Sequence, residues 1–97
     1  MFVKIHQAYR ILVAVCDSDI AGKKFEDKEL QLDLSCNFYK GEEMPESRIL
    51  ELFKVVNIIN LAGENAVQLG IKAGIVDKKN VMKINGIPHA QAVVLIE

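Results

Sequence analysis

His89 and Gln91 form the first pair of residues that could do chemistry in this chain. An imidazole titrates near neutral pH, so His89 is a candidate base, acid or ligand. Gln91 follows two residues later and would project from the same face of a strand. The alternative interpretation is a half-buried histidine whose ring bonds a backbone carbonyl near a turn.

Asn60 and Glu64 form a second polar pair, expected on one face of a helix because they are four residues apart. Their neighbours are apolar, and an unpaired buried amide costs roughly 1–3 kcal/mol, so partners must exist. One interpretation is that they bind backbone groups freed where Gly63 interrupts the helix. In the other, they face His89 and Gln91 across a shared corner and form a site for a ligand or a peptide terminus.

The third candidate is Cys16-Asp17 at the end of a predicted strand, with Lys23 in the following loop. Loops at strand ends often carry binding residues, and Lys23 could hold an anion. The preferred interpretation of Asp17 is a turn cap, because its side chain can bond nearby backbone groups. A cysteine nucleophile needs a nearby cation or helix N-terminus, and the sequence places neither beside Cys16. We therefore assign no catalytic residue here.

The sequence contains no recognisable motif for binding a metal or a cofactor. Cys16, Cys36, His6 and His89 are the only soft ligands, and the cysteines do not form a Cys-x-x-C pair. All four would have to converge to close a zinc site, so we expect ordinary free thiols, with no metal and no cofactor. A disulfide would be expected only in a hyperthermophile.

Length and composition predict one soluble globular domain spanning residues 1–97, with 51% hydrophobic and 26% charged residues. No apolar run approaches the roughly 20 residues of a membrane helix, and the N-terminus lacks a signal pattern, so a cytoplasmic location is expected. The net charge is −1 with both signs interspersed, which argues against direct binding to nucleic acid or membrane.

Strands are predicted where β-branched residues gather or apolar residues alternate. Residues 2–6 and 11–16 read as two strands joined by a four-residue loop, and Leu30, Leu32 and Leu34 alternate as in a half-buried strand.

Asn85-Gly86 between apolar runs predicts a two-residue hairpin that joins strands at 81–84 and 87–96. In that register His89 opposes Met82, and the Pro88 nitrogen points away from the partner strand.

Residues 45–73 are predicted to be helical, as one bent helix or two helices separated at Gly63. Residues 49–62 are apolar nearly all round, and Gly74 is suited to the left-handed C-cap. Strands on both sides of one helical block predict an α+β two-layer fold, with a mainly antiparallel sheet packed by these helices.

Self-association is expected because the helix predicted over residues 49–62 is apolar nearly all round, yet a helix covers a sheet with only one of its faces. The remaining apolar surface must be covered elsewhere. Residues 92–96 add an uncharged strand with nothing to discourage edge pairing. We therefore predict a homodimer with a two-fold interface that uses part of this helix or the C-terminal strand.

Several residue groups spread over nearly the whole chain resemble the archaeal domain-of-unknown-function family 424. These groups are Phe2-Val-Lys-Ile-His6, Cys16-Asp17 with Gly22-Lys23, Phe38-Tyr39 with Gly41-Glu42-Glu43, Asn60-Leu-Ala-Gly-Glu64 with Ala66-Val67, and Gly86-Ile-Pro-His-Ala-Gln91. The resemblance implies a small archaeal cytoplasmic protein, and it implies no activity.

Two functions from different classes remain open. The first is a non-enzymatic binding or adaptor module that engages a protein or ribonucleoprotein through the exposed helix face and the His89 corner. The alternative is a small hydrolase or transferase that uses His89 with Glu64 or Asp17.

Overall fold

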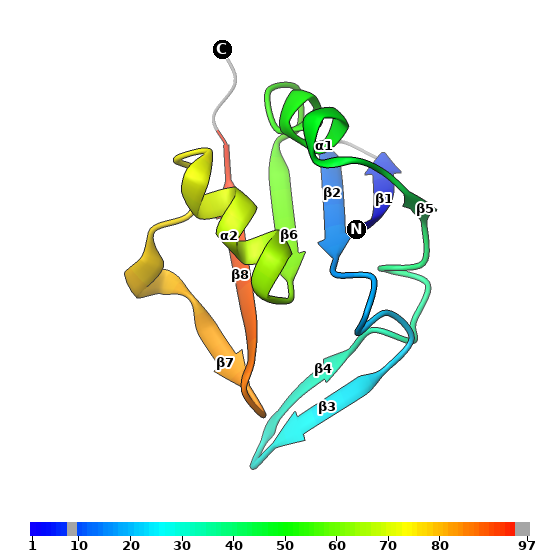
Figure 1. Cartoon of the computed structure of the whole chain (residues 1–97), viewed down its shortest axis with the longest axis vertical. Coiled ribbons are helices and arrows are strands. Elements are labelled where there is room, and N and C mark those ends of the chain that lie inside the picture. The colour runs from blue at the N-terminus through cyan, green and yellow to red at the C-terminus, as the bar shows by residue number, and fades with distance from the viewer. Residues whose placement is uncertain (8–9, 95–97) are drawn as a thin grey trace.

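The computed structural model describes residues 1–7 and 10–94. The described elements up to residue 43 are all strands, and helices and further strands follow them (Figure 1). They are β1 (Phe2–Gln7), β2 (Ile11–Cys16), β3 (Lys24–Asp27), β4 (Leu30–Asp33), β5 (Glu42–Glu43), α1 (Glu46–Leu52), β6 (Ile58–Ala62), α2 (Glu64–Lys72), the 3-10 helix η1 (Lys78–Asn80), β7 (Met82–Ile84) and β8 (Ile87–Val93). Neither α-helix has the length and hydropathy that crossing a bilayer requires.

The main sheet has six strands in the order β5-β1-β2-β6-β8-β7. Every neighbouring pair is antiparallel except β2 and β6, which run parallel. The fold is therefore a mixed α+β fold with a mostly antiparallel sheet and two α-helices. The parallel pair makes the two central strands end at the same edge of the sheet, where β2 leads into Asp17 and β6 leads into α2.

The predicted helical block at 45–73 is wrong in its middle, because residues 58–62 form the central strand β6. β6 lies between β2 and β8, and four of its five residues are buried. A strand buried on both faces is apolar at successive positions, so periodicity alone does not separate it from a buried helix. The helix is thereby divided into α1 and α2, and Gly74 has the expected left-handed φ of 77° after the second.

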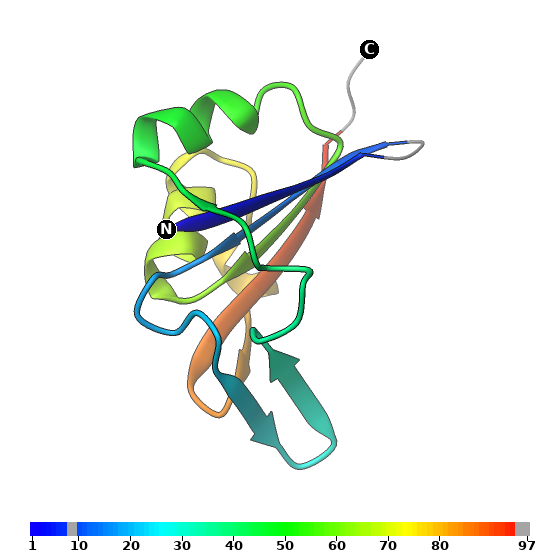
Figure 2. The same ribbon diagram turned by 90° about the vertical axis from the view of Figure 1, so that its right-hand side faces the viewer.

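The predicted leucine strand exists as β4, but it does not join the main sheet. It pairs with β3 in a separate two-stranded hairpin, and no strand was predicted at residues 24–27. Figure 2 shows this hairpin extending beyond one end of the main sheet. Leu32 and Leu34 pack there against Ala14, Cys16 and Ala62.

Apolar residues are buried on both faces of the main sheet. The helices lie on one face (Figure 2), where Ile49 and Phe53 of the α1 region and Val67 and Leu69 of α2 share a cluster with strand residues such as Leu61. The β3–β4 hairpin and the loop that carries Tyr39 cover part of the other face.

The two predicted hairpins are confirmed. β1 and β2 pair from Phe2 opposite Cys16 onwards, and the middle of their connection, residues 8–9, lies outside the described residues. The β7–β8 turn has positive φ angles of 49° and 80° at its two central residues, as Asn-Gly turns require. Met82 opposes His89 as predicted. The predicted end of this last strand, residues 95–96, also lies outside the described part.

Candidate functional site

The structure brings three candidate residues together on β6 and β8. Asn60 lies directly opposite Gln91, and Ala62 lies opposite His89 in the same antiparallel pair. Because directly opposed residues project to the same side, Asn60, His89 and Gln91 share the face that is turned away from the helices.

We call the uncovered part of this face the open face. Its members project from neighbouring strands to the side that is turned away from the helices. They are Lys4, His6, Leu12, Ile58, Asn60, Met82, His89, Gln91 and Val93.

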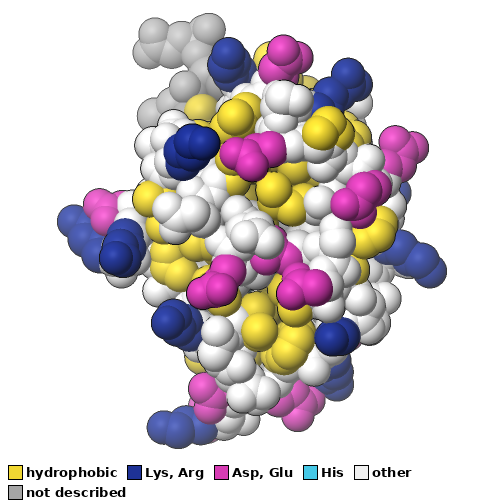
Figure 3. Space-filling view, viewed as in Figure 1, with side chains coloured by type: hydrophobic (Ala, Val, Ile, Leu, Met, Phe, Trp, Pro, Cys, Tyr) yellow, Lys and Arg dark blue, Asp and Glu magenta, His cyan; other side chains and the backbone are white. Residues whose placement is uncertain are grey.

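The open face and the helix-bearing face differ in charge. β1, β2, β6 and β8 contain no Asp or Glu, so Lys4 supplies the charge on the open face beside two imidazoles. On the opposite face, acidic side chains gather near the start of α2 and no histidine is visible (Figure 3). Asp19 and Glu64 line one cavity there. The two faces therefore differ in where their acidic side chains lie.

His89 is half-buried, and this burial lowers the pKa of its imidazole below the ordinary value of 6.5. His6 was considered only as a metal ligand from the sequence, yet it lies on the same face. Its Nε2 is 2.9 Å from the Phe38 carbonyl oxygen, and its ring stacks on Phe38 with centroids 4.7 Å apart. The alternation of Lys4 and His6 along β1 was the signal for this position.

Asn60 and Glu64 do not share a helix face. Asn60 lies on the central strand with 8% of its surface exposed, whereas Glu64 is the first residue of α2 and is exposed. The expected shared corner therefore contains Asn60, His89 and Gln91 without Glu64, and Asn60 cannot be the residue that ties off the chain at Gly63.

Asp17 caps helix α2 across the fold. Its side chain is buried, and its carboxylate accepts hydrogen bonds from the backbone N–H groups of Asn65 (2.9 Å) and Ala66 (2.7 Å). The Asp17 N–H donates to the Ala62 carbonyl at 3.0 Å. A helix N-terminus beside parallel strand ends often binds anions, but here the carboxylate of the chain itself occupies that position. The capping interpretation of Asp17 holds, although the capped element is a distant helix instead of a local turn.

Cys16 is unsuited to nucleophilic chemistry. Burial, with Asp17 beside it, raises the pKa of its thiol to about 12, and the thiol donates to the Asp17 carbonyl. Cys36 is exposed, and both cysteines are free. Lys23 lies in the loop before β3, where its carbonyl accepts from the Leu34 N–H at 2.8 Å. The structure does not bring Lys23 to the open face.

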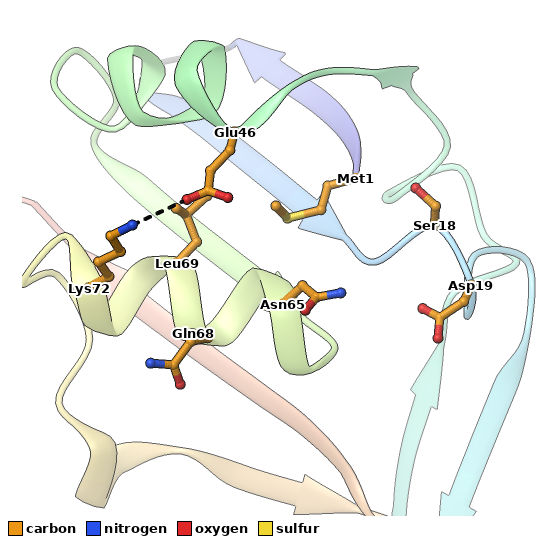
Figure 4. A pocket seen from close by; sticks show the side chains of 8 residues that line it. All are labelled: Met1, Ser18, Asp19, Glu46, Asn65, Gln68, Leu69 and Lys72. Carbon is orange, nitrogen blue, oxygen red and sulfur yellow. Dashed lines mark ion pairs between the residues drawn. The ribbon is translucent and has the colours of Figure 1, made fainter.

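A cavity lies on the helix-bearing side, between the start of α1 and helix α2 (Figure 4). It measures about 580 Å³, and the Glu46–Lys72 ion pair at 3.8 Å closes one side of it. Sequence reasoning did not identify Asn65 and Gln68, which line this cavity from exposed positions three residues apart on α2. Glu64 lines two smaller cavities of about 470 and 190 Å³.

None of the five cavities found over residues 1–7 and 10–94 is lined by His89, and no carboxylate within that range hydrogen-bonds to it. Within the same residues, no group of three or more His, Cys, Asp or Glu side chains is placed to hold a metal ion. The amide and imidazole groups of the open face therefore lie outside these five cavities.

Residues 5–95 match the model of the family described as "Protein of unknown function (DUF424)". The chain belongs to this family. A solved relative of this DUF424 protein is described as "Crystal structure of an uncharacterized conserved protein from Methanopyrus kandleri", an archaeal protein with 27% sequence identity and a TM-score of 0.81. That likeness covers 99% of this chain and 92% of the other. No curated protein matches the chain.

The comparisons confirm the resemblance that the residue groups predicted, and they support an archaeal setting for the DUF424 fold. They attach no activity to it. Any function of this DUF424 protein must therefore be argued from its surfaces.

Proposed function

We propose that this DUF424 protein is a binding module whose open face docks a polypeptide segment that carries carboxylates. The observation that carries the proposal is the composition of this face. The side-chain amides of Asn60 on β6 and Gln91 on β8 lie directly opposite each other, and one lysine and two histidines lie on the same face. Strands β1, β2, β6 and β8 contain no acidic residue.

The open face has both parts of a protein interface. Asn60 and Gln91 supply amide donors and acceptors that match the hydrogen-bonding groups of a polypeptide. Met82 and Val93 are 49% and 59% exposed and supply apolar contacts at the margin. Because Asn60 stands on the central strand, its position is fixed by hydrogen-bonded neighbours on both sides, so little freedom is lost on binding.

Charge favours an acidic partner segment. Strands β1, β2, β6 and β8 carry no acidic residue that could neutralise Lys4. Glu43 on the neighbouring strand β5 is bonded to the N-terminal amine and to the Ser18 hydroxyl. An incoming carboxylate would meet a favourable potential on this face and an unfavourable one on the helix-bearing face, where acidic groups gather (Figure 3). This asymmetry would select one face for docking.

The hydrolase or transferase alternative gains no support from the geometry. Glu64 lies at the start of the helix layer, on the other side of the sheet from His89, and both Asp17 oxygens are committed to the cap of α2. A general base needs an orienting partner within hydrogen-bond reach, and His89 has no carboxylate partner among the described residues.

Photo-crosslinking tests the proposal. A benzophenone amino acid replaces Met82 on the open face, and a matched variant carries it at Ile5, which is 43% exposed on the opposite face of β1. Each variant is irradiated in a lysate of an archaeon that encodes a DUF424 protein. We expect a discrete protein adduct at Met82 and not at Ile5, and we expect Lys4→Glu to suppress it.

Mass spectrometry of the adducts decides between outcomes. Support requires that the crosslinked peptide of the partner carry Asp or Glu residues near the point of attachment. Equal labelling at both positions, an adduct that ribonuclease removes, or an adduct that Lys4→Glu leaves unchanged would each overturn the proposal.

A further inference from the structure

Strand β8 is longer than the strand that protects it. β7 pairs only with Ile87, Pro88 and His89, whereas β8 continues to Val93. On its other side β8 pairs with β6 as far as Val93 opposite Ile58. The second half of β8 therefore has a neighbour on one side only within residues 1–7 and 10–94.

The direction of the backbone groups identifies which ones are free. The Pro88 carbonyl accepts from Gly63 at 2.9 Å, and the Val94 N–H donates to the Asn57 carbonyl at 2.7 Å, so even-numbered residues of β8 bond toward β6. Backbone groups alternate in direction along an antiparallel strand. The N–H and C=O groups of Gln91 and Val93 therefore point to the side where β7 has already ended.

Edge strands are normally protected by charges, proline or a covering segment. The opposite edge of the sheet follows this rule, because β5 covers the start of β1 with Glu42 and Glu43. Residues 87–94 contain no charged side chain, and Val93 is 59% exposed at the free part. Pro88 does not protect this edge, because its backbone groups point toward β6.

We propose that the free edge of β8 pairs with the same edge of a second copy of this chain. The two strands run antiparallel about a two-fold axis beside Ala92, so that Gln91 of each copy lies opposite Val93 of the other. The interface is isologous, and because the segment is uncharged, two identical copies bring no like charges together. Each copy satisfies the free backbone groups of the other, and Val93 leaves solvent.

This pairing extends the sheet through both copies and sets their open faces side by side. It involves the backbone of Gln91 and Val93, whereas the docking proposed above involves side chains of the open face, so each holds without the other. The shared segment is short, because Met82 already occupies the edge at His89. The dimer is therefore expected to be reversible and dependent on concentration.

Sedimentation velocity tests the pairing with the full chain, from about 10 to about 500 µM, where mass action favours association. We expect a shift from one 10.8 kDa species toward twice that mass. Val93→Lys puts a charge at the free edge and should raise the dissociation constant at least about tenfold. Val55→Lys is the matched control, because Val55 has the same 59% exposure but follows α1.

Amide hydrogen exchange locates the interface and remains informative if a variant folds poorly. The Gln91 and Val93 amides of the unmodified chain should exchange quickly in the monomer and become protected as concentration rises. A single 10.8 kDa species throughout, a dimer that Val93→Lys leaves intact, or concentration-dependent protection confined to the helices would overturn the proposal.

Discussion

The carboxylate of Asp17 should be the most sensitive single group for stability. It accepts two hydrogen bonds, from Asn65 and Ala66, inside a site where its own surface is 4% exposed. Asp17→Asn keeps one acceptor oxygen and places an amide N–H₂ against the other backbone donor. One charge-assisted bond of roughly 1.5–3 kcal/mol is lost. The favourable interaction of the carboxylate with the helix dipole, about 0.3–1 kcal/mol, is lost with it.

The expected decrease in the free energy of unfolding is therefore about 2–4 kcal/mol, a large part of the roughly 5–15 kcal/mol typical of a domain. With a urea m-value of roughly 1–2 kcal/mol/M, the unfolding midpoint should fall by about 1–4 M. Urea titration followed by circular dichroism measures this shift. An unchanged m-value would show that the transition remains comparable with that of the unmodified chain.

Asp77 supplies the matched control. Its carboxylate caps η1 through one bond to the Lys79 N–H at 3.1 Å, and that bond is exposed. Asp77→Asn should cost at most about 1 kcal/mol, because water replaces the lost bond. The reasoning fails if Asp17→Asn is no more destabilising than Asp77→Asn.

Three further results should follow from other residues. Gly63→Ala should lower the free energy of unfolding clearly more than Gly74→Ala in the same urea titration. Both glycines have positive φ, but a Cβ at Gly63 would lie 2.4 Å from Asp17 Cγ, whereas a Cβ at Gly74 would meet open space. Equal losses of stability in the two variants would contradict the packing around Gly63. In the native chain a thiol reagent at pH 8 should label the exposed Cys36 and leave the buried Cys16 unlabelled, because the pKa of the Cys16 thiol is about 12. In denaturant both cysteines should react. Rapid labelling of both cysteines in the native chain would refute the prediction. Because the pKa of His89 is lowered in the folded state, the unfolded chain takes up the proton first as the pH falls. The free energy of unfolding should therefore fall as the pH drops below about 6.5, and His89→Gln should weaken this pH dependence. Identical pH profiles of the two proteins would show that His89 is not the cause.

Local patterns were sufficient for much of the sheet. The Asn85-Gly86 turn fixes the register of β7 and β8, so the opposition of Met82 and His89 followed from two residues. The alternation along β8 also placed His89 and Gln91 on one face correctly. These predictions succeeded because each depends on neighbours in the sequence.

Long-range pairing explains the failures. β6 was predicted to be helical because most of its residues are apolar. On one face Ile59 and Leu61 pack in the cluster that α2 shares, and on the other Ala62 packs against the hairpin cluster, and these long-range contacts do not show in the residues of β6 themselves. β3 has little strand signal and forms because β4 lies opposite it. Asn60 belongs with His89 and Gln91, but through a strand pairing that the helical prediction did not contain.

The parallel pairing of β2 with β6 also has a consequence for synthesis on the ribosome. β2 ends at Cys16, and its inner partner does not begin until Ile58, after both hairpin strands and α1 have been made. Until then the nascent chain carries β2 with an unprotected inner edge and an uncovered apolar stripe, and the carboxylate of Asp17 has no helix to cap. Native structure in the N-terminal half therefore depends on residues made late, so a ribosome that stalls before β6 would release a fragment prone to aggregation.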